Sequence, residues 1–103
     1  MRQFDIFANR SPRSQSRAPY LLVLPFRYFL DRRTTVIAPL IPEHLLTPVE
    51  RLNPTFIVEE RAVVLSPLEL VAIPTSELAI LVGNLESERD TIIAALDFLF
   101  TGV

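Results

Sequence analysis

The apolar positions of this chain fall into short runs that are separated by proline, charge or turn residues. Runs of about four to eight apolar or β-branched residues between such breaks are typical of β-strands. The strands predicted on this basis cover residues 4–7, 20–24, 34–38, 52–58 and 61–65. The last two flank Glu59-Glu60, so we expect them to pair as a hairpin.

Prolines and polar residues are predicted to set the limits of these strands. Residues 9–19 contain three Ser and three Arg among two prolines, and are predicted to form a polar loop. Pro25 limits the second strand because proline cannot donate a ladder hydrogen bond, and Pro39 and Pro42 are predicted to end the third strand. Between these two strands, residues 26–30 carry three aromatic side chains.

The segments that follow the hairpin are less definite. Residues 66–72 begin like a short helix, with Ser66 as its cap and Pro67 at the first helical position, but their second half fits a strand equally well. Residues 77–82 fit either a strand or a helix, and Gly83-Asn84 is predicted to turn the chain.

Residues 87–100 are predicted to form the one long helix, about 21 Å in length. Ser87, with Asp90 three residues later, resembles a capping box. The stripe expected to face the core has the spacing i, i+4, i+7, i+11 and consists of Ile92, Leu96, Leu99 and Val103. Neighbouring positions are also apolar, so we expect this end of the chain to be covered by its own domain, a second copy or a partner.

Length and element order together predict the fold class. A chain of 103 residues is predicted to form a single domain over residues 1–103. Strands followed by one terminal helix predict a mainly β protein, in which the helix docks on a small, mostly antiparallel sheet.

Composition and charge narrow the class of protein. Half of the residues are hydrophobic, which excludes a disordered chain. The net charge is −2, but residues 1–33 carry +5 and the remainder −7, which suits head-to-tail contacts or a charged peptide partner, or else reflects a solvated Arg-rich loop. No apolar run approaches the roughly 20 residues of a membrane span and no signal peptide is evident, so we expect a cytoplasmic protein.

Few residues are available for catalysis. The chain has no Cys, only two Gly and a single His, His44, which excludes thiolate chemistry, a Gly-rich phosphate loop and a His-based metal site. We therefore predict no catalytic residues, no metal and no cofactor, and a function in binding. One enzymatic alternative remains, cleavage of RNA by Arg and a polar partner, with phosphates tracked by Arg10, Arg13, Arg17 and Arg27.

Several short motifs occur in a characteristic order along nearly the whole chain. They are Gln3-Phe4, Val36-Ile37-Ala38-Pro39-Leu40, Leu52-x-Pro54, Ile73-Pro74 and Asp97-x-x-Phe100-x-Gly102-Val103. In this order and at this length they resemble the CcdB family of bacterial toxins. The resemblance implies a five-stranded, SH3-like antiparallel sheet with a small side sheet and a C-terminal helix.

The resemblance also implies a function. Toxins of this family are homodimers that bind the DNA gyrase A subunit and trap gyrase on cleaved DNA, and a CcdA-like antitoxin neutralises them by wrapping the dimer. They are not enzymes and need no cofactor. The same fold serves MazF-type endoribonucleases, so such a ribonuclease is one alternative. A degenerate toxin that retains only antitoxin binding is another.

Site residues follow from matching positions. Those that resemble the gyrase-binding positions of the family are Phe29, Leu30, Asp97, Thr101, Gly102 and Val103. A helix with two apolar stripes can give one of them to a symmetry mate, which predicts a dimer seam at Phe98, Leu99 and Val103. Antitoxin tails of the family are acidic, so Arg10, Arg13 and Arg17 are predicted to bind the antitoxin.

Two positions depart from the family pattern. Asp97 replaces Asn, which adds a charge, and Thr101 replaces a Trp that stacks on an Arg of gyrase. Without compensation, losing such a hot spot lowers affinity by about 2–4 kcal/mol, or roughly 30- to 1000-fold.

Overall fold

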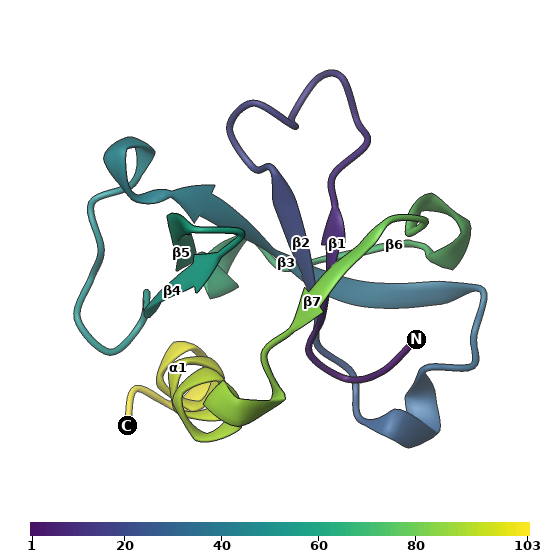
Figure 1. The fold of residues 1–103 in the computed structure, drawn as a ribbon. Helices are drawn as coiled ribbons and strands as arrows, with labels where there is room; N and C mark the ends of the chain where they lie inside the picture. The colour runs from purple at the N-terminus through teal and green to yellow at the C-terminus, as the bar shows by residue number, and fades with distance from the viewer.

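The computed structural model describes residues 1–103, which form seven strands, one α-helix and five short 3-10 turns. Figure 1 shows the strands fanning out into a curled sheet, with the helix packed beneath it. The strands are β1 (Asp5–Ala8), β2 (Tyr20–Val23), β3 (Thr34–Pro42), β4 (Thr55–Val58), β5 (Arg61–Leu65), β6 (Val71–Pro74) and β7 (Leu81–Asn84). The helix α1 spans Arg89–Thr101, and the 3-10 turns are η1 (Arg27–Phe29), η2 (Glu43–Leu45), η3 (Pro67–Glu69), η4 (Thr75–Glu77) and η5 (Glu86–Glu88).

All strand pairs are antiparallel, in the order β4-β5-β3-β2-β1-β7, and β6 pairs with β3 outside this path. The long strand β3 joins the parts of the sheet, because its first half pairs with β6 and its last three residues pair with β5. The predicted fold class is therefore confirmed: a mainly β, half-barrel sheet with a C-terminal helix, consistent with a small β-barrel-like fold. The predicted hairpin around Glu59-Glu60 is confirmed as β4 and β5.

The predicted end of the third strand at Pro39 is wrong, because β3 continues to Pro42. The carbonyl oxygen of Pro39 accepts a hydrogen bond from the backbone N–H of Ser66, at 3.1 Å. The N–H and C=O groups of one strand residue point to the same side, so the missing proline N–H faces the connection between β5 and β6. The carbonyl oxygen of Ser66 on that side accepts from the N–H of Glu69 instead, at 3.2 Å, so the strand tolerates the proline.

The core lies on both faces of the sheet. Because side chains alternate along a strand, Ile6 joins a cluster of 13 buried residues on the side of α1, while Phe7 joins a smaller cluster on the opposite face. From the helix, Ile92 and Ala95 are buried, and Leu96 packs at the edge of the larger cluster. The predicted core stripe is thus right at its beginning but wrong at Val103, which is 77% exposed.

The start of the helix also differs from the prediction. Gly83-Asn84 ends β7 instead of forming a turn. Ser87 lies inside η5 and makes no capping hydrogen bond, so the predicted capping box is absent. The side chain of Asn84 serves this end of the chain instead: its Oδ1 accepts a hydrogen bond from the N–H of Glu86, at 2.6 Å.

The two segments that fitted either a helix or a strand each lead from a short 3-10 turn into a strand. Residues 66–72 contain the turn η3 and then enter β6, while residues 77–82 run from the end of η4 into β7. No helix has both the length and the apolar character that a membrane span requires.

Candidate functional site at the end of α1

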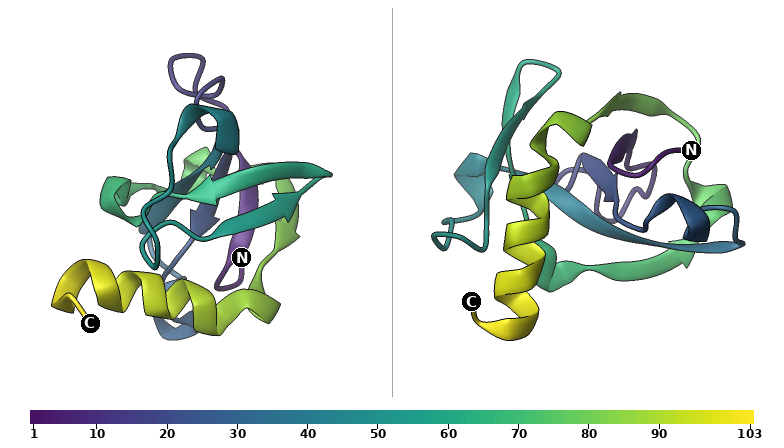
Figure 2. Two further views of the ribbon diagram at one scale, coloured as in Figure 1. Left: turned by 90° about the vertical axis from the view of Figure 1, so that its left-hand side faces the viewer. Right: turned by 90° about the horizontal axis from the view of Figure 1, so that it is seen from below.

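The C-terminal end of α1 projects past the sheet, as both views in Figure 2 show. It is closed by local hydrogen bonds. Gly102 adopts the left-handed conformation (φ 76°) and its N–H donates to the carbonyl oxygen of Phe98, at 2.9 Å. The hydroxyl of Thr101 donates to the carbonyl oxygen of Asp97, at 2.7 Å, and accepts from the N–H of Val103, at 3.3 Å.

Arg51 holds this end from outside the helix. Its Nη2 donates to the carbonyl oxygen of Val103, at 2.6 Å, and its guanidinium lies 4.5 Å from the centre of the Phe98 ring. A cation at the end of a helix also interacts favourably with the helix dipole. Sequence reasoning missed Arg51, because it lies in an irregular loop about fifty residues from its partners.

A groove runs beside the helix end, between η1, β3 and the last turns of α1. Its volume is about 530 Å³, and six of its ten lining residues are hydrophobic, Phe29, Leu96 and Phe100 among them. Phe29 is 58% and Phe100 71% exposed. Thr35 also lines the groove; it is 2% exposed, and its hydroxyl has no hydrogen-bond partner. This hydroxyl is buried within the chain and not open to the groove, so the groove is suited to an occupant that is mainly apolar.

The family model described as CcdB protein matches residues 3–102. The chain belongs to the CcdB family. Its members are toxins of toxin–antitoxin systems, and they poison DNA gyrase rather than catalyse a reaction. In general they form dimers and bind gyrase and an antitoxin. No curated protein matches the chain.

The residues predicted from the resemblance to bind gyrase fall into two groups. Asp97, Thr101, Gly102 and Val103 are exposed together at the end of α1, and Phe29 faces the same groove as Phe100. Leu30 is different, since it is 9% exposed and belongs to the small cluster with Phe7. Leu30 directly follows η1 and joins this turn to that cluster.

The residues predicted for the CcdB dimer seam are only partly free. Phe98 and Leu99 are half-buried within the chain itself, and Arg51 covers one face of the Phe98 ring. Val103 is exposed. Phe100 is the most exposed apolar side chain of the helix proper, although sequence reasoning had assigned it no role.

The three arginines predicted to bind the antitoxin lie in the loop between β1 and β2, and one of them is already paired. Arg17 forms a bidentate ion pair with Glu69, with N–O distances of 2.7 and 3.2 Å. The hydroxyl of Ser66 donates to the same carboxylate, at 2.6 Å. The hydrogen bond from Arg17 lowers the pKa of Glu69, which burial alone would raise. Arg10 and Arg13 are exposed and take part in no ion pair.

Groups for covalent or metal chemistry are sparse in this CcdB chain. No three His, Cys, Asp or Glu residues gather into a metal-binding cluster. His44 is exposed in η2. Arg10 and Glu77, however, line one small pocket of about 450 Å³ beside β2.

Proposed function

We propose that this protein binds the gyrase A subunit, traps the gyrase–cleaved DNA complex, and is neutralised by a CcdA-like antitoxin. The observation that carries this proposal is the family match over residues 3–102, together with the exposed end of α1. The mechanism is wedging: the end of the toxin dimer occupies an open gyrase conformation and slows religation.

The gyrase-binding surface is proposed to comprise Phe29, Asp97, Thr101, Gly102 and Val103, with Leu30 positioning Phe29. The hydroxyl of Thr101 is engaged in closing the helix, so Thr101 offers a partner its methyl group but no free hydroxyl. We infer that Phe100 supplies the aromatic surface that Trp provides in the family pattern. Its exposure of 71% and its place beside Phe29 in the groove support this assignment.

A homodimer is part of the proposal. A two-fold axis near Phe98, Leu99 and Val103 brings two identical helix ends together. Val103 is exposed and Phe98 and Leu99 are half-buried, so apolar surface remains there for a second copy to cover. Sedimentation as a monomer at high concentration would contradict this arrangement.

Gyrase poisoning is tested with purified protein, gyrase, ATP and supercoiled plasmid, by looking for linear DNA after detergent. Phe100→Ala should reduce potency by about 30-fold or more, as expected for a hot-spot aromatic residue. Ile57→Ala is the matched control, because Ile57 is equally exposed on β4 near the opposite end of the helix. No cleaved product at micromolar protein, or equal losses in both variants, would refute the proposal.

Antitoxin binding is proposed for Arg10, Arg13 and Arg17. Charge pairing at exposed sites is screened by salt, so the affinity of the complex should fall as ionic strength rises. Because Arg17 must exchange Glu69 for the antitoxin, Arg17→Gln should weaken the complex less than Arg13→Gln does. Indifference to salt would contradict this assignment.

A second candidate function is an endoribonuclease. The observation in its favour is the pocket shared by Arg10 and Glu77, since a carboxylate can act as a base while a guanidinium stabilises a charged phosphate. Cleavage of a defined single-stranded RNA without gyrase, abolished by Glu77→Gln, would establish it.

A further inference from the structure

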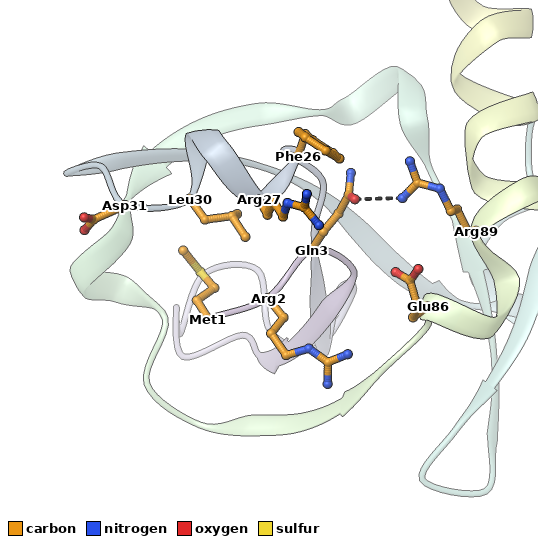
Figure 3. Close-up of a pocket in the computed structure, with 9 residues that line it drawn as sticks. All are labelled: Met1, Arg2, Gln3, Phe26, Arg27, Leu30, Asp31, Glu86 and Arg89. Atoms are coloured by element: carbon orange, nitrogen blue, oxygen red, sulfur yellow. Dashed lines mark hydrogen bonds between the residues drawn. The ribbon is translucent and has the colours of Figure 1, made fainter.

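Another pocket lies at the N-terminal end of β1 and shares no lining residue with the groove at the helix end. Its volume is about 730 Å³, within the range of ligand sites in proteins. Three segments that are distant in sequence form its walls: residues 1–3, the chain around η1, and the start of α1. Figure 3 shows side chains from all three segments gathered around it.

The pocket collects three arginines that form no ion pair within the chain. Arg2, Arg27 and Arg89 all line it. The chain's one ion pair is between Arg17 and Glu69, so none of these three arginines has a carboxylate partner. Each guanidinium carries five N–H donors, which leaves many of them available to a ligand.

Two of these arginines are nevertheless held in place. Nη1 of Arg89 donates to Oε1 of Gln3, at 2.8 Å, and the amide of Gln3 is itself fixed by a hydrogen bond to the carbonyl oxygen of Leu24, at 2.9 Å. The guanidinium of Arg27 lies 5.4 Å from the Phe26 ring and 5.1 Å from the Tyr28 ring. Prior positioning of donors reduces the entropy lost on binding.

The lining also indicates which anion fits. Asp31 and Glu86 line the pocket as well, so three positive charges face two negative ones. The two carboxylates disfavour a ligand of high negative charge, such as a phosphate dianion or a nucleic-acid backbone, and a single carboxylate meets less repulsion. Met1, Phe26 and Leu30 supply apolar wall beside the charges.

We propose that this pocket binds an acidic side chain of a partner protein, presented on a segment with an apolar side chain next to it. The carboxylate is received by Arg27 and Arg89, and the apolar neighbour packs against Phe26 and Met1. Binding here requires neither gyrase nor the arginines of the loop between β1 and β2, which lie beyond the other end of β1. It can therefore be measured whether or not the protein poisons gyrase.

The test uses the full-length protein and a fluorescent, acetylated hexapeptide of alternating Glu and Leu. Binding of the peptide is measured by fluorescence anisotropy. Saturable binding is expected, weakened by salt and absent for the matching Gln-Leu peptide. Arg27→Gln and Arg89→Gln should each weaken binding by about tenfold or more, as for the loss of a hydrogen bond to a charged group. Arg27 is exposed on a surface turn, so Arg27→Gln leaves the core intact even if Arg89→Gln, which frees Gln3, perturbs the fold.

Two further variants sharpen the result. Glu86→Gln removes a repelling charge and should tighten binding by about two- to fivefold, the range expected for a partly exposed charge pair. Arg61→Gln should leave binding unchanged, because Arg61 is exposed on β5 and does not line this pocket. Equal binding of both peptides, or no effect of the Arg27 and Arg89 changes, would overturn the proposal. Displacement of the peptide by submillimolar inorganic phosphate would overturn the choice of a carboxylate ligand and assign the pocket to a phosphate group.

Discussion

Replacing Arg51 tests how the exposed end of α1 is held in place. Arg51→Ala removes both the hydrogen bond to the carbonyl oxygen of Val103 and the contact with the Phe98 ring. At an exposed site the cation–π contact is worth about 0.5–1 kcal/mol, and the hydrogen bond contributes about 0.5–1.5 kcal/mol net. We therefore expect a loss of about 1–2 kcal/mol, or roughly 5–15 °C in Tm for a domain of this size.

A second substitution at the same position separates the side chain from the backbone. Arg51 has a φ of 72°, in the left-handed region that favours glycine. Arg51→Gly loses the same two contacts as Arg51→Ala but relieves the strain of a Cβ atom, so it should be about 1 kcal/mol more stable than the alanine variant.

Thermal unfolding followed by circular dichroism measures both variants, and the gyrase cleavage assay measures the consequence for activity. If Arg51 positions the helix end, both variants should poison gyrase less well than the unchanged protein, although the glycine variant is the more stable of the two. An alanine variant with unchanged Tm would refute the anchoring role. A glycine variant less stable than the alanine variant would refute the backbone reasoning.

Three other substitutions test the hairpin, the ion pair and the core. Glu59 and Glu60 have φ values of 49° and 65° at the hairpin tip, as a type I′ turn requires, so Glu60→Gly should raise the unfolding free energy in urea by about 1 kcal/mol, and a decrease would contradict the assigned strain. The hydrogen bond from Arg17 lowers the pKa of Glu69, so this contribution to stability is complete above the unfolded pKa of about 4.3 and is lost as pH falls through the lower folded pKa. Glu69→Gln should therefore flatten the acid limb of the stability–pH profile, whereas an unchanged limb would exclude this role. Ile92 is fully buried beneath the sheet, so Ile92→Ala should lower the free energy of unfolding in urea by about 2–5 kcal/mol. A loss well below that range would mean that the helix is not docked as described.

The sequence pattern was sufficient for the fold wherever local rules and tertiary packing agree. The hairpin around Glu59-Glu60 and the final helix follow from periodicity and flanking residues, and both are confirmed. The pattern failed at Pro39, because whether a proline breaks a strand depends on which neighbour its missing N–H would face. That neighbour is fixed only when β5 and β6 have both paired with β3.

Residue matching predicted a site at the end of α1 but not the residues that arrange this end. Arg51 acts from a loop, and the pocket formed with Arg2, Arg27 and Arg89 joins three separate segments. No spacing rule connects such positions, since their proximity is a property of the folded chain. One signal was available, however: the first third of the chain holds seven of the ten arginines, and two of those seven line this pocket.

The departure at Thr101 bears on the direction from which a partner approaches the helix end. Successive residues of an α-helix point about 100° apart. An aromatic ring at position 100 therefore faces a different side of the helix from one at position 101, and here that side is the groove that also contains Phe29. Thr101, meanwhile, turns its hydroxyl back onto the helix and leaves the tip small. If Phe100 takes the place of the missing Trp, the gyrase contact moves from the tip of the helix toward the groove, and Phe29 gains importance relative to Gly102 and Val103.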